Sequence, residues 1–227
     1  MKREIIKTGD GSTTIFLPEW NEHYHSKHGA VQEALHVFIK SGLNFFIERY
    51  SVTNLSILEI GFGTGLNAMV TFFEARKNGV FVDYTGVEAY PVVSEELKNL
   101  NYSASFEEKG LAQKVFDKIH KTGWDEKEEI SEDFRLTKQQ KFFNEIDASE
   151  DFDLIYFDAF GPRVQPELWT EEIFGKMFRA LKSGGVLVTY SAKGSVRRGM
   201  QDVGFQVGRI PGPPGKREML RATKPIT

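Results

Sequence analysis

The sequence has no cysteine. Disulfide scaffolds, thiolate metal sites and cysteine nucleophiles are therefore excluded, and a reducing compartment is expected. Long apolar runs are also missing, because glycine or a charged residue interrupts each run well short of the length that crosses a bilayer. The N-terminus, MKREIIKTGDGS, contains no apolar stretch of signal-peptide length. These absences predict a soluble, cytoplasmic protein.

The composition is that of an ordinary globular chain. The 227 residues are 40% hydrophobic and 27% charged, which fits one enlarged domain or one domain with an appendage. The formal net charge is −3, but its distribution is uneven. Residues 193–224 hold eight basic against two acidic side chains, whereas residues 125–133 are mostly acidic. The basic end is expected either to face phosphates or to be a solvated face without a partner.

From residue 55 the sequence repeats a pattern of strand, glycine turn, helix and strand. An apolar run at 55–60 leads into the glycines of 61–65, a helical segment follows at 66–78, and a second strand is expected at 81–87. This is a βαβ unit, which builds a parallel sheet.

The rest of the chain continues this pattern. Three more strands are expected at 134–137, 153–157 and 186–190, with a helix from Thr170 to the glycines of 183–185 and a shorter one from Ser195 to Gly204. The last two strands, 205–210 and 218–223, are joined by a short proline-glycine loop, so they should be antiparallel. The predicted fold is α/β, a doubly wound Rossmann-like sheet that is mostly parallel with a C-terminal antiparallel hairpin; it resembles the class I methyltransferase fold.

The first fifty residues follow a different pattern. Short strands are expected at Ile5 and at 15–17, and helix-spaced apolar residues run from 30 to 50 with an interruption at 41–42. We interpret residues 1–50 as an N-terminal appendage that packs on the ligand pocket, and residues 51–227 as the main domain.

The glycine turn of the βαβ unit predicts a nucleotide-type ligand. Glycines are needed where a strand turns sharply into a helix and the backbone lies against a ligand. A dinucleotide fingerprint would place its third glycine at position 66, where this sequence has Leu66, whereas the glycine stands at Gly65. This spacing matches S-adenosylmethionine enzymes. The loop residues expected at the cofactor are Glu59, Gly61, Phe62, Gly63, Thr64, Gly65 and Asn67.

Two carboxylates have expected roles at this ligand. Glu59, just before the loop, could pair with the ammonium of the amino acid end. Glu88, at the end of the second strand, could accept both ribose hydroxyls of an adenosine. Thr64 and Asn67 could add contacts, but either could instead cap the helix.

Three motifs resemble those of the MnmC-type tRNA methyltransferase family. They are the segment EIGFGTGLN at 59–67, FDAFGP at 157–162 followed by PELW at 166–169, and VRRGMQDVGF at 196–205 followed by GKREM at 215–219. The similarity runs from Tyr24 to the C-terminus and corresponds to the stand-alone methyltransferase form without a flavin oxidoreductase domain. Tyr24 and Ser26 resemble the family's N-terminal segment, which borders the cofactor pocket.

The resemblance implies an enzyme and a reaction. A methyl group would pass from S-adenosylmethionine to the 5-aminomethyl group of wobble (2-thio)uridine in tRNA, giving 5-methylaminomethyl, after a separate enzyme has made the aminomethyl precursor. One departure from related enzymes is that no acid follows the third strand at 138–141 to hold adenine, so Gln139 or Gln140 are the possible substitutes.

Asp158 is the candidate catalytic residue, and it would also border the cofactor. It follows the predicted strand 153–157, at the carboxyl edge where ligands of such sheets bind. An attacking amine nitrogen becomes positive as it takes the methyl group, so a carboxylate beside it favours the transition state. Orientation and charge stabilisation are the expected roles; the alternative is that Asp158 only caps the turn.

Several residues are candidates for contact with RNA. Phe160 and Trp169 could stack on an extruded base, although core packing is the commoner fate of such a tryptophan. Basic side chains near the hairpin could meet phosphates of the anticodon stem-loop. The substrate-side candidates are Phe160, Pro162, Trp169, Arg197, Arg198, Lys216 and Arg217.

Other interpretations are open at this point. His23, His25 and His28 lie close together, but no metal is expected because no partner acids are spaced for a closed site. A small-molecule amine transferase of the same fold, such as an aminopropyltransferase, would also need an acid at Asp158. A catalytically silent module that binds the cofactor or RNA is the alternative outside enzymes.

Overall fold

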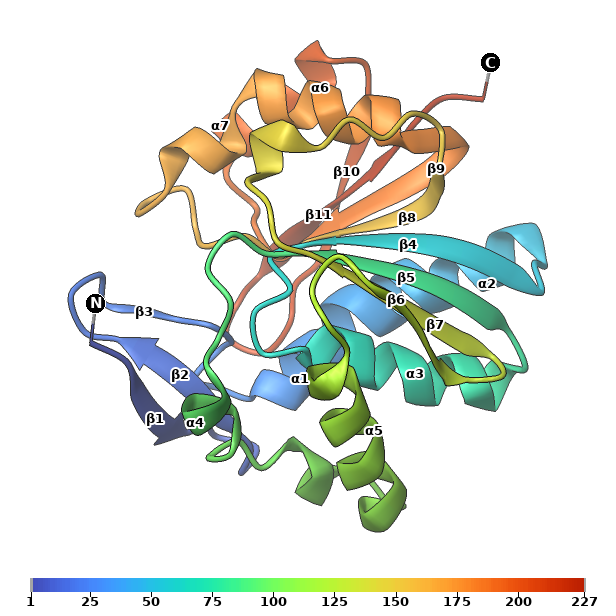
Figure 1. Ribbon diagram of the computed structural model, residues 1–227. Helices are drawn as coiled ribbons and strands as arrows, with labels where there is room; N and C mark the ends of the chain where they lie inside the picture. Colours follow the sequence, from blue (N-terminus) through green and yellow to red (C-terminus); the bar gives the residue numbers. More distant parts are fainter. Residues whose placement is uncertain (1, 227) are drawn as a thin grey trace.

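The computed structural model describes residues 2–226 and contains one eight-stranded sheet (Figure 1). In spatial order its strands are β10 (Gln206–Pro211), β11 (Glu218–Thr223), β9 (Leu181–Thr189), β8 (Phe152–Phe157), β4 (Asn54–Ile60), β5 (Phe81–Val87), β7 (Phe134–Gln139) and β6 (Lys127–Ser131). The five strands from β9 to β7 in this order are parallel. At one edge β11 runs antiparallel to both of its neighbours, β9 and β10. At the other edge β6 runs antiparallel to β7. The predicted mostly parallel sheet with a C-terminal hairpin is confirmed.

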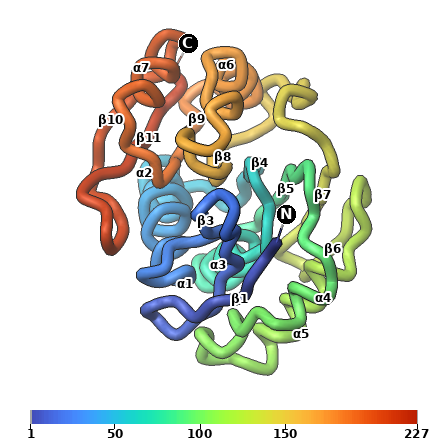
Figure 2. The backbone as a smooth tube through the Cα atoms, turned by 90° about the vertical axis from the view of Figure 1, so that its left-hand side faces the viewer, coloured from blue at the N-terminus to red at the C-terminus, as the bar shows by residue number. Residues whose placement is uncertain are grey.

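Helices cover both faces of this sheet (Figures 1 and 2). One face carries α1 (Ala30–Ala34), η1 (Leu35–Asn44), α2 (Phe45–Tyr50), α3 (Leu66–Asn78) and α5 (Lys109–Lys121). The other face carries α6 (Glu171–Ala180) and α7 (Gly194–Asp202). Two apolar clusters fill the space on either side, and central strand residues alternate between them: Ile57 belongs to one cluster and Leu58 to the other. The continuous apolar runs of the sequence reflect this burial on both faces.

The order of the strands creates a crevice at the carboxyl edge. After β4 the chain forms β5, β6 and β7, all on one side of β4, and then returns to form β8 on the other side of β4. The neighbouring strands β4 and β8 end in register, with Ile60 opposite Phe157. The glycine loop and Asp158 therefore leave the sheet side by side, where ligands of doubly wound sheets bind.

The N-terminal segment contributes to two places. The strands β1 (Glu4–Lys7), β2 (Thr13–Leu17) and β3 (Glu22–His23) form a separate antiparallel sheet. Residues 30–50 instead pack into the core of the main sheet. The division of the chain at residue 50 stays a prediction.

The helix at 30–50 is continuous, so the interruption expected at 41–42 is wrong. Its middle section, η1, has π-helical winding, and the Ser41 hydroxyl donates a hydrogen bond of 2.8 Å to the His36 carbonyl. A Cβ at Gly42 would lie 3.0 Å from Val188 and 3.3 Å from Tyr156. The small residues therefore let the helix approach the sheet closely rather than ending it.

Three further boundaries differ from expectation. The helix α6 ends at Ala180 rather than at the glycines of 183–185, because β9 already begins at Leu181. Gly184 and Gly185 therefore lie within β9, whose pairing with β8 is irregular near its start. The residue before α7 is Lys193, and Ser195 does not cap this helix. The acidic segment 125–133, for which the sequence pattern predicts no element, contains the edge strand β6, with three exposed residues in succession.

Short elements complete the description. They are α4 (Ser94–Leu97), η2 (Tyr102–Ser105), η3 (Phe143–Glu145) and η4 (Pro166–Trp169). Within residues 2–226, none of the helices has the length and apolar character needed to cross a membrane.

Candidate functional site

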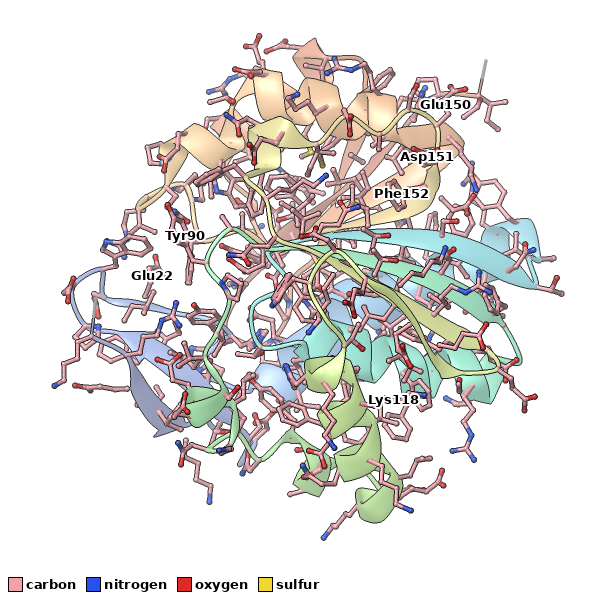
Figure 3. All side chains as sticks on the ribbon, in the orientation of Figure 1. Glu22, Tyr90, Lys118, Glu150, Asp151 and Phe152 are labelled. Atoms are coloured by element: carbon pink, nitrogen blue, oxygen red, sulfur yellow. The ribbon has the colours of Figure 1, made fainter. Side chains whose placement is uncertain are left out.

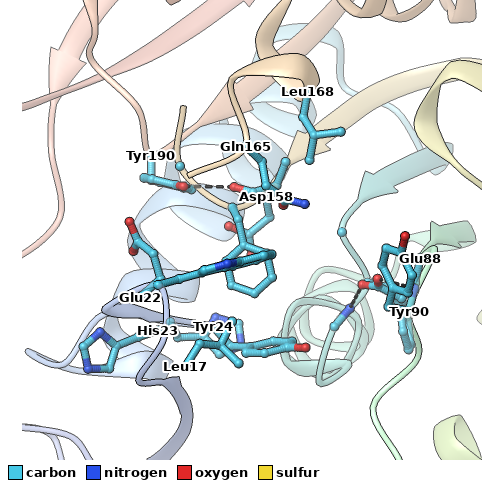
Figure 4. A pocket seen from close by; sticks show the side chains of 18 of the residues that line it. Leu17, Glu22, His23, Tyr24, Glu88, Tyr90, Asp158, Gln165, Leu168 and Tyr190 are labelled. Atoms are coloured by element: carbon cyan, nitrogen blue, oxygen red, sulfur yellow. Dashed lines mark hydrogen bonds between the residues drawn. The ribbon is translucent and has the colours of Figure 1, made fainter. Parts of the chain in front are cut away.

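A cavity of about 1370 Å³ lies at the carboxyl edge of the main sheet, between that edge and the N-terminal strands. Its wall is contributed by residues 20–28, the glycine loop, the ends of β5 and β8, and the tip of the β10–β11 hairpin. Figure 3 shows Glu22 and Tyr90, which both line it, on the same side of the molecule, far from Glu150 and Asp151. Figure 4 shows Asp158 and Tyr190 on one side of the cavity and Glu88 and Tyr90 on the other.

The glycine loop brings backbone, rather than side chains, to this cavity. Gly61 has a φ of +87°, and a Cβ there would lie 2.8 Å from the carbonyl oxygen of Asp158. Gly63 has a φ of +49°, and a Cβ there would lie 3.1 Å from the Tyr24 ring. Both positions therefore need glycine for conformation and for space. Gly61, Phe62 and Gly63 line the cavity, whereas Thr64 and Gly65 lie behind it.

Glu88 is held facing the loop. One carboxylate oxygen accepts a hydrogen bond from Gly63 N at 3.0 Å and the other accepts one from Tyr90 N at 2.9 Å. The side chain also lines the cavity, where its remaining lone pairs can accept further hydrogen bonds.

Two exposed aromatic rings form the rim next to Glu88. Tyr90 is 64% exposed and Phe142 is 52% exposed, and their ring centres lie 5.9 Å apart. Gln139 and Gln140, which the sequence offered for adenine, are not among the cavity residues. The rim is therefore an exposed aromatic edge of the cavity mouth.

A chain of hydrogen bonds connects the buried acid to Asp158. Glu59 is completely buried and accepts hydrogen bonds from Tyr84 Oη at 2.8 Å and Asn67 Nδ2 at 2.7 Å. The same Asn67 amide donates to Asp158 Oδ2 at 2.8 Å. Glu59 and Asn67 therefore do not line the cavity; they brace the carboxylate that does.

The two carboxyl groups joined by these hydrogen bonds, Glu59 and Asp158, both have raised pKa values. Burial raises the pKa of Glu59 well above its ordinary value. Burial also raises the pKa of Asp158, and the negative charge of Glu33 adds to the effect, while the Asn67 hydrogen bond and the Lys216 charge oppose it. A carboxyl group with a raised pKa in a cleft marks a candidate for proton transfer or charge stabilisation.

The substrate-side candidates lie in different surroundings. Phe160 lines the cavity, with its ring centre 5.0 Å from that of Tyr24. Trp169 is only 7% exposed, donates a 2.8 Å hydrogen bond to the Phe160 carbonyl and packs on Phe157, so it belongs to the core. Pro162 lies in the loop beyond Phe160 and is not a cavity residue.

The four basic candidates differ in exposure and in whether they reach the cavity. Arg198 and Arg217 are exposed, and Arg197 is half-buried with its Nε unpartnered. Lys216 lies inside the cavity wall, where its Nζ is 2.8 Å from Glu33 Oε1.

The cavity also contains residues that the sequence analysis did not predict, namely Glu33, Tyr190 and the rim of Tyr90 and Phe142. Only the rim had a signal in the sequence, because its two aromatic residues come just after the second and third parallel strands.

The three clustered histidines have separate environments. His23 stacks on Phe16, His28 lies against Gly215, and His25 is buried against Thr64. In the part of the chain from 2 to 226, no group of three or more histidine, aspartate or glutamate side chains is arranged to hold a metal ion.

Two histidines, His25 buried and His120 half-buried, lie behind the glycine loop. His25 Nε2 lies 2.9 Å from Thr64 Oγ1, which also accepts a 3.0 Å hydrogen bond from Tyr102 Oη. His120 lies against the same loop, with its Cε1 3.2 Å from where a Cβ on Gly65 would stand. Burial lowers the pKa of each histidine from 6.5 to about 4. Both are therefore neutral in the folded protein at neutral pH.

Stability should fall in mild acid because of these histidines. In the unfolded chain these histidines bind a proton below about pH 6.5, whereas in the folded chain they do so only below about pH 4. The free energy of unfolding is therefore highest above pH 6.5 and decreases as the pH falls from 6.5 to 4. We expect a loss of roughly 3 kcal/mol per histidine across this pH range. Urea unfolding at a series of pH values measures it. His25→Gln should reduce the slope against pH, whereas Thr64→Val, which removes the partner but keeps the titrating ring, should not; equal slopes in the wild type and His25→Gln would contradict the prediction.

Comparison with known sequences gives two findings. A family profile described as "S-adenosyl-L-methionine-dependent methyltransferase" matches residues 104–225. Two proteins named "tRNA 5-methylaminomethyl-2-thiouridine biosynthesis bifunctional protein MnmC" are similar over almost the whole chain. The one from Nitrosospira multiformis is 30% identical over 93% of this chain and 35% of its own length, and the one from Hydrogenovibrio crunogenus is 29% identical over 96% and 33%. The chain thus spans about a third of the length of these curated relatives.

Solved structures share the fold. The crystal structure of MNMC2 from Aquifex aeolicus superposes with a TM-score of 0.77 and 24% identity, covering 99% of this chain and 72% of that one. Spermidine synthase from Thermotoga maritima superposes with a TM-score of 0.55 and 15% identity, covering 100% and 73%. The same backbone architecture therefore occurs in both proteins.

Proposed function

Because the chain belongs to the S-adenosyl-L-methionine-dependent methyltransferase family, we propose that it methylates the 5-aminomethyl group of wobble (2-thio)uridine in tRNA, giving 5-methylaminomethyl. Family membership confirms the methyltransferase assignment and its cofactor. The tRNA substrate is supported by the curated relatives, whose names describe tRNA 5-methylaminomethyl-2-thiouridine biosynthesis.

The residues at the carboxyl edge fit the cofactor. The Gly61–Gly63 backbone offers a cradle that a Cβ would fill, and Glu88 offers carboxylate oxygens for ribose hydroxyls. Tyr90 and Phe142 offer ring edges and faces for adenine. When bound, the cofactor supplies an electrophilic methyl group on a sulfonium sulfur. The protein's contribution is to place a neutral amine nitrogen in line with that methyl group.

The charge of the cavity is the observation that carries the proposal. Six of its residues are acidic, namely Glu22, Glu33, Glu88, Asp158, Glu167 and Glu172, and three are cationic, namely Arg3, Lys27 and Lys216. A net negative cavity attracts an amine and repels phosphate. We infer that only the modified base enters, while the phosphates remain on the basic surface outside.

Asp158 is the residue suited to the amine. With a lysine-like pKa, an amine would need about 4.6 kcal/mol to be presented neutral at pH 7. A carboxylate whose pKa is raised by burial is a better proton acceptor than an ordinary aspartate, and its charge stabilises the positive nitrogen that forms as the methyl group is transferred. The chain from Glu59 through Asn67 holds this carboxylate in place.

The exposed arginines near the hairpin should bind the RNA backbone. The double change Arg198→Glu with Arg217→Glu is expected to weaken tRNA binding and to lower the slope of log Kd against log salt by about 0.7–0.9 for each phosphate that the protein no longer neutralises. A salt titration of tRNA affinity measures both effects. Arg76→Glu with Lys77→Glu, at the end of α3 away from the glycine loop, makes the same charge change and should leave the slope as it is. Equal slopes in both double variants would place the RNA elsewhere.

A direct assay tests the function. The protein is incubated with labelled S-adenosylmethionine and tRNA that carries the unmethylated aminomethyl base, and the nucleosides are analysed by mass spectrometry. We expect the label in 5-methylaminomethyl uridine. No label in that RNA, together with transfer from the cofactor to free polyamines, would instead identify a small-molecule amine transferase.

A further inference from the structure

The protein holds one of its own ammonium groups in the cavity. Lys216, on the loop between β10 and β11, places Nζ 2.8 Å from Glu33 Oε1 and 4.0 Å from the centre of the Tyr190 ring. The first distance is that of a charge-assisted hydrogen bond, and the second lies well within cation–π range. A carboxylate and an aromatic face thus enclose a primary ammonium; we call Glu33 and Tyr190 the ammonium cage.

The cage is built from fixed parts. Glu33 lies in α1, its side chain is 10% exposed, and its second oxygen accepts a 2.7 Å hydrogen bond from Ser26 N. Tyr190 follows β9, and its hydroxyl donates a 2.9 Å hydrogen bond to the carbonyl of Ala159, the residue after Asp158. The hydrogen bond from Tyr190 is drawn in Figure 4. The cage is therefore pre-formed and tied to the backbone beside the catalytic candidate.

The occupant is less firmly held than the cage. Lys216 has 36% of its side chain exposed and sits at the tip of a proline-glycine hairpin loop, away from the regular strand pairing. Its ammonium group can leave by rotation of its own side chain, without rearranging α1 or β9. Lysine and a protonated aminomethyl group present the same chemical group, a primary alkylammonium.

We propose that Glu33 and Tyr190 form the subsite that binds the acceptor's ammonium group before Asp158 accepts a proton from it, and that Lys216 occupies this subsite until the acceptor displaces it. The inference rests on the proposed function in that it takes the acceptor to be an amine. Exchange of one cation for another keeps the cage neutralised throughout. Without a cation there, Glu33 and Asp158 would be like charges in one cavity without a neutralising partner, consistent with the effect of Glu33 on the pKa of Asp158. Lys216 is accordingly a cavity residue rather than a phosphate contact.

Removal of the placeholder tests this proposal. In Lys216→Met, which keeps a similar length without the charge, ethylammonium should bind and raise the Tm saturably, whereas the wild type should show no saturable shift. The uncharged isostere ethanol is the control ligand and should have no saturable effect on either protein. No ethylammonium binding by Lys216→Met, or an ethanol effect of equal size, would overturn the proposal.

Second-site variants locate the binding. Adding Glu33→Gln or Tyr190→Leu to Lys216→Met should weaken ethylammonium binding at least about tenfold, the effect of losing about 1.4 kcal/mol. Adding Tyr190→Phe, which keeps the aromatic face, should preserve most of it. Circular dichroism and S-adenosylmethionine titration establish that each variant is folded. Ethylammonium affinity unchanged by Glu33→Gln would place the ion elsewhere and overturn the cage.

The outcome is separable from the tRNA assay. The binding experiment contains no RNA and measures no methyl transfer. Binding to the cage without methylation of the aminomethyl tRNA would reject the proposed substrate and keep the ammonium subsite. Methylated tRNA with no ethylammonium binding in Lys216→Met would keep the proposed function and reject the subsite.

Discussion

Replacing Asp158 with asparagine is expected to lower kcat for methyl transfer by about 10²–10³-fold while leaving cofactor affinity measurable. The change removes the negative charge beside the acceptor nitrogen but keeps a side-chain oxygen that can still accept the 2.8 Å hydrogen bond from Asn67. The backbone bond from Asp158 N to the Ile60 carbonyl is also retained, so the loop geometry should survive. Single-turnover transfer and calorimetric cofactor titration measure the two quantities separately.

The pH profile gives this prediction a second readout. Because burial raises the pKa of Asp158, the wild-type rate should begin to fall, as the pH is lowered, at a higher pH than an ordinary aspartate with a pKa of 3.8 would produce. The asparagine variant should lack that acid limb. Glu167→Gln removes another cavity carboxylate and should leave both the rate and the limb in place. A near-normal kcat in Asp158→Asn would remove Asp158 from the mechanism.

Replacing Gly61 with alanine is expected to abolish cofactor binding and with it methyl transfer. The residue has a φ of +87°, and the added Cβ would approach the carbonyl oxygen of Asp158 to 2.8 Å. Because that atom is backbone, either the glycine loop or the end of β8 must move, and both line the cavity in which we propose that the cofactor binds. Cofactor titration and the Tm of the variant measure the effects.

Gly79→Ala is the matched control for this substitution. Gly79 ends α3 with a φ of +63°, but a Cβ there would meet nothing within 4 Å. Both variants should lose about 1–2 kcal/mol of stability from the left-handed conformation. Only Gly61→Ala should also lose the cofactor. Equal cofactor affinity in the two variants would show that the close approach to Asp158 is tolerated.

The central βαβ unit was predictable because its signals are local. The strand β5 (Phe81–Val87) and the helix α3 (Leu66–Asn78) have the expected bounds, since apolar runs and glycines mark both ends. The adjacency of the glycine loop and Asp158 was also accessible, because carboxyl ends of parallel strands share one edge of a sheet.

The ammonium cage was beyond sequence reasoning. Glu33, Tyr190 and Lys216 come from a helix, a strand end and a hairpin tip, and 183 residues separate the two members of the ion pair. No local pattern encodes that meeting. The position of Glu59 behind the loop was equally hidden, because the partners that bury it, Tyr84 and Asn67, are set by the packing of β5 and α3 against β4.

The edge strand β6 was missed for a different reason. Its sequence, Lys127–Ser131, is exposed at its first three positions and has no apolar alternation. An edge strand needs only one neighbour, and its backbone hydrogen bonds to β7 do not require buried side chains.

The same strand determines what can happen at that border of the molecule. It is an edge strand with β7 as its one neighbour in the sheet, and an open sheet edge is the usual template for unwanted association of sheets. Glu128 and Glu129 are exposed there, and Glu132 and Asp133 follow in the turn to β7. A second copy aligning along this border would bring carboxylates against carboxylates, and like charges directly opposite each other are destabilising, so the acidic segment disfavours continuation of the sheet there.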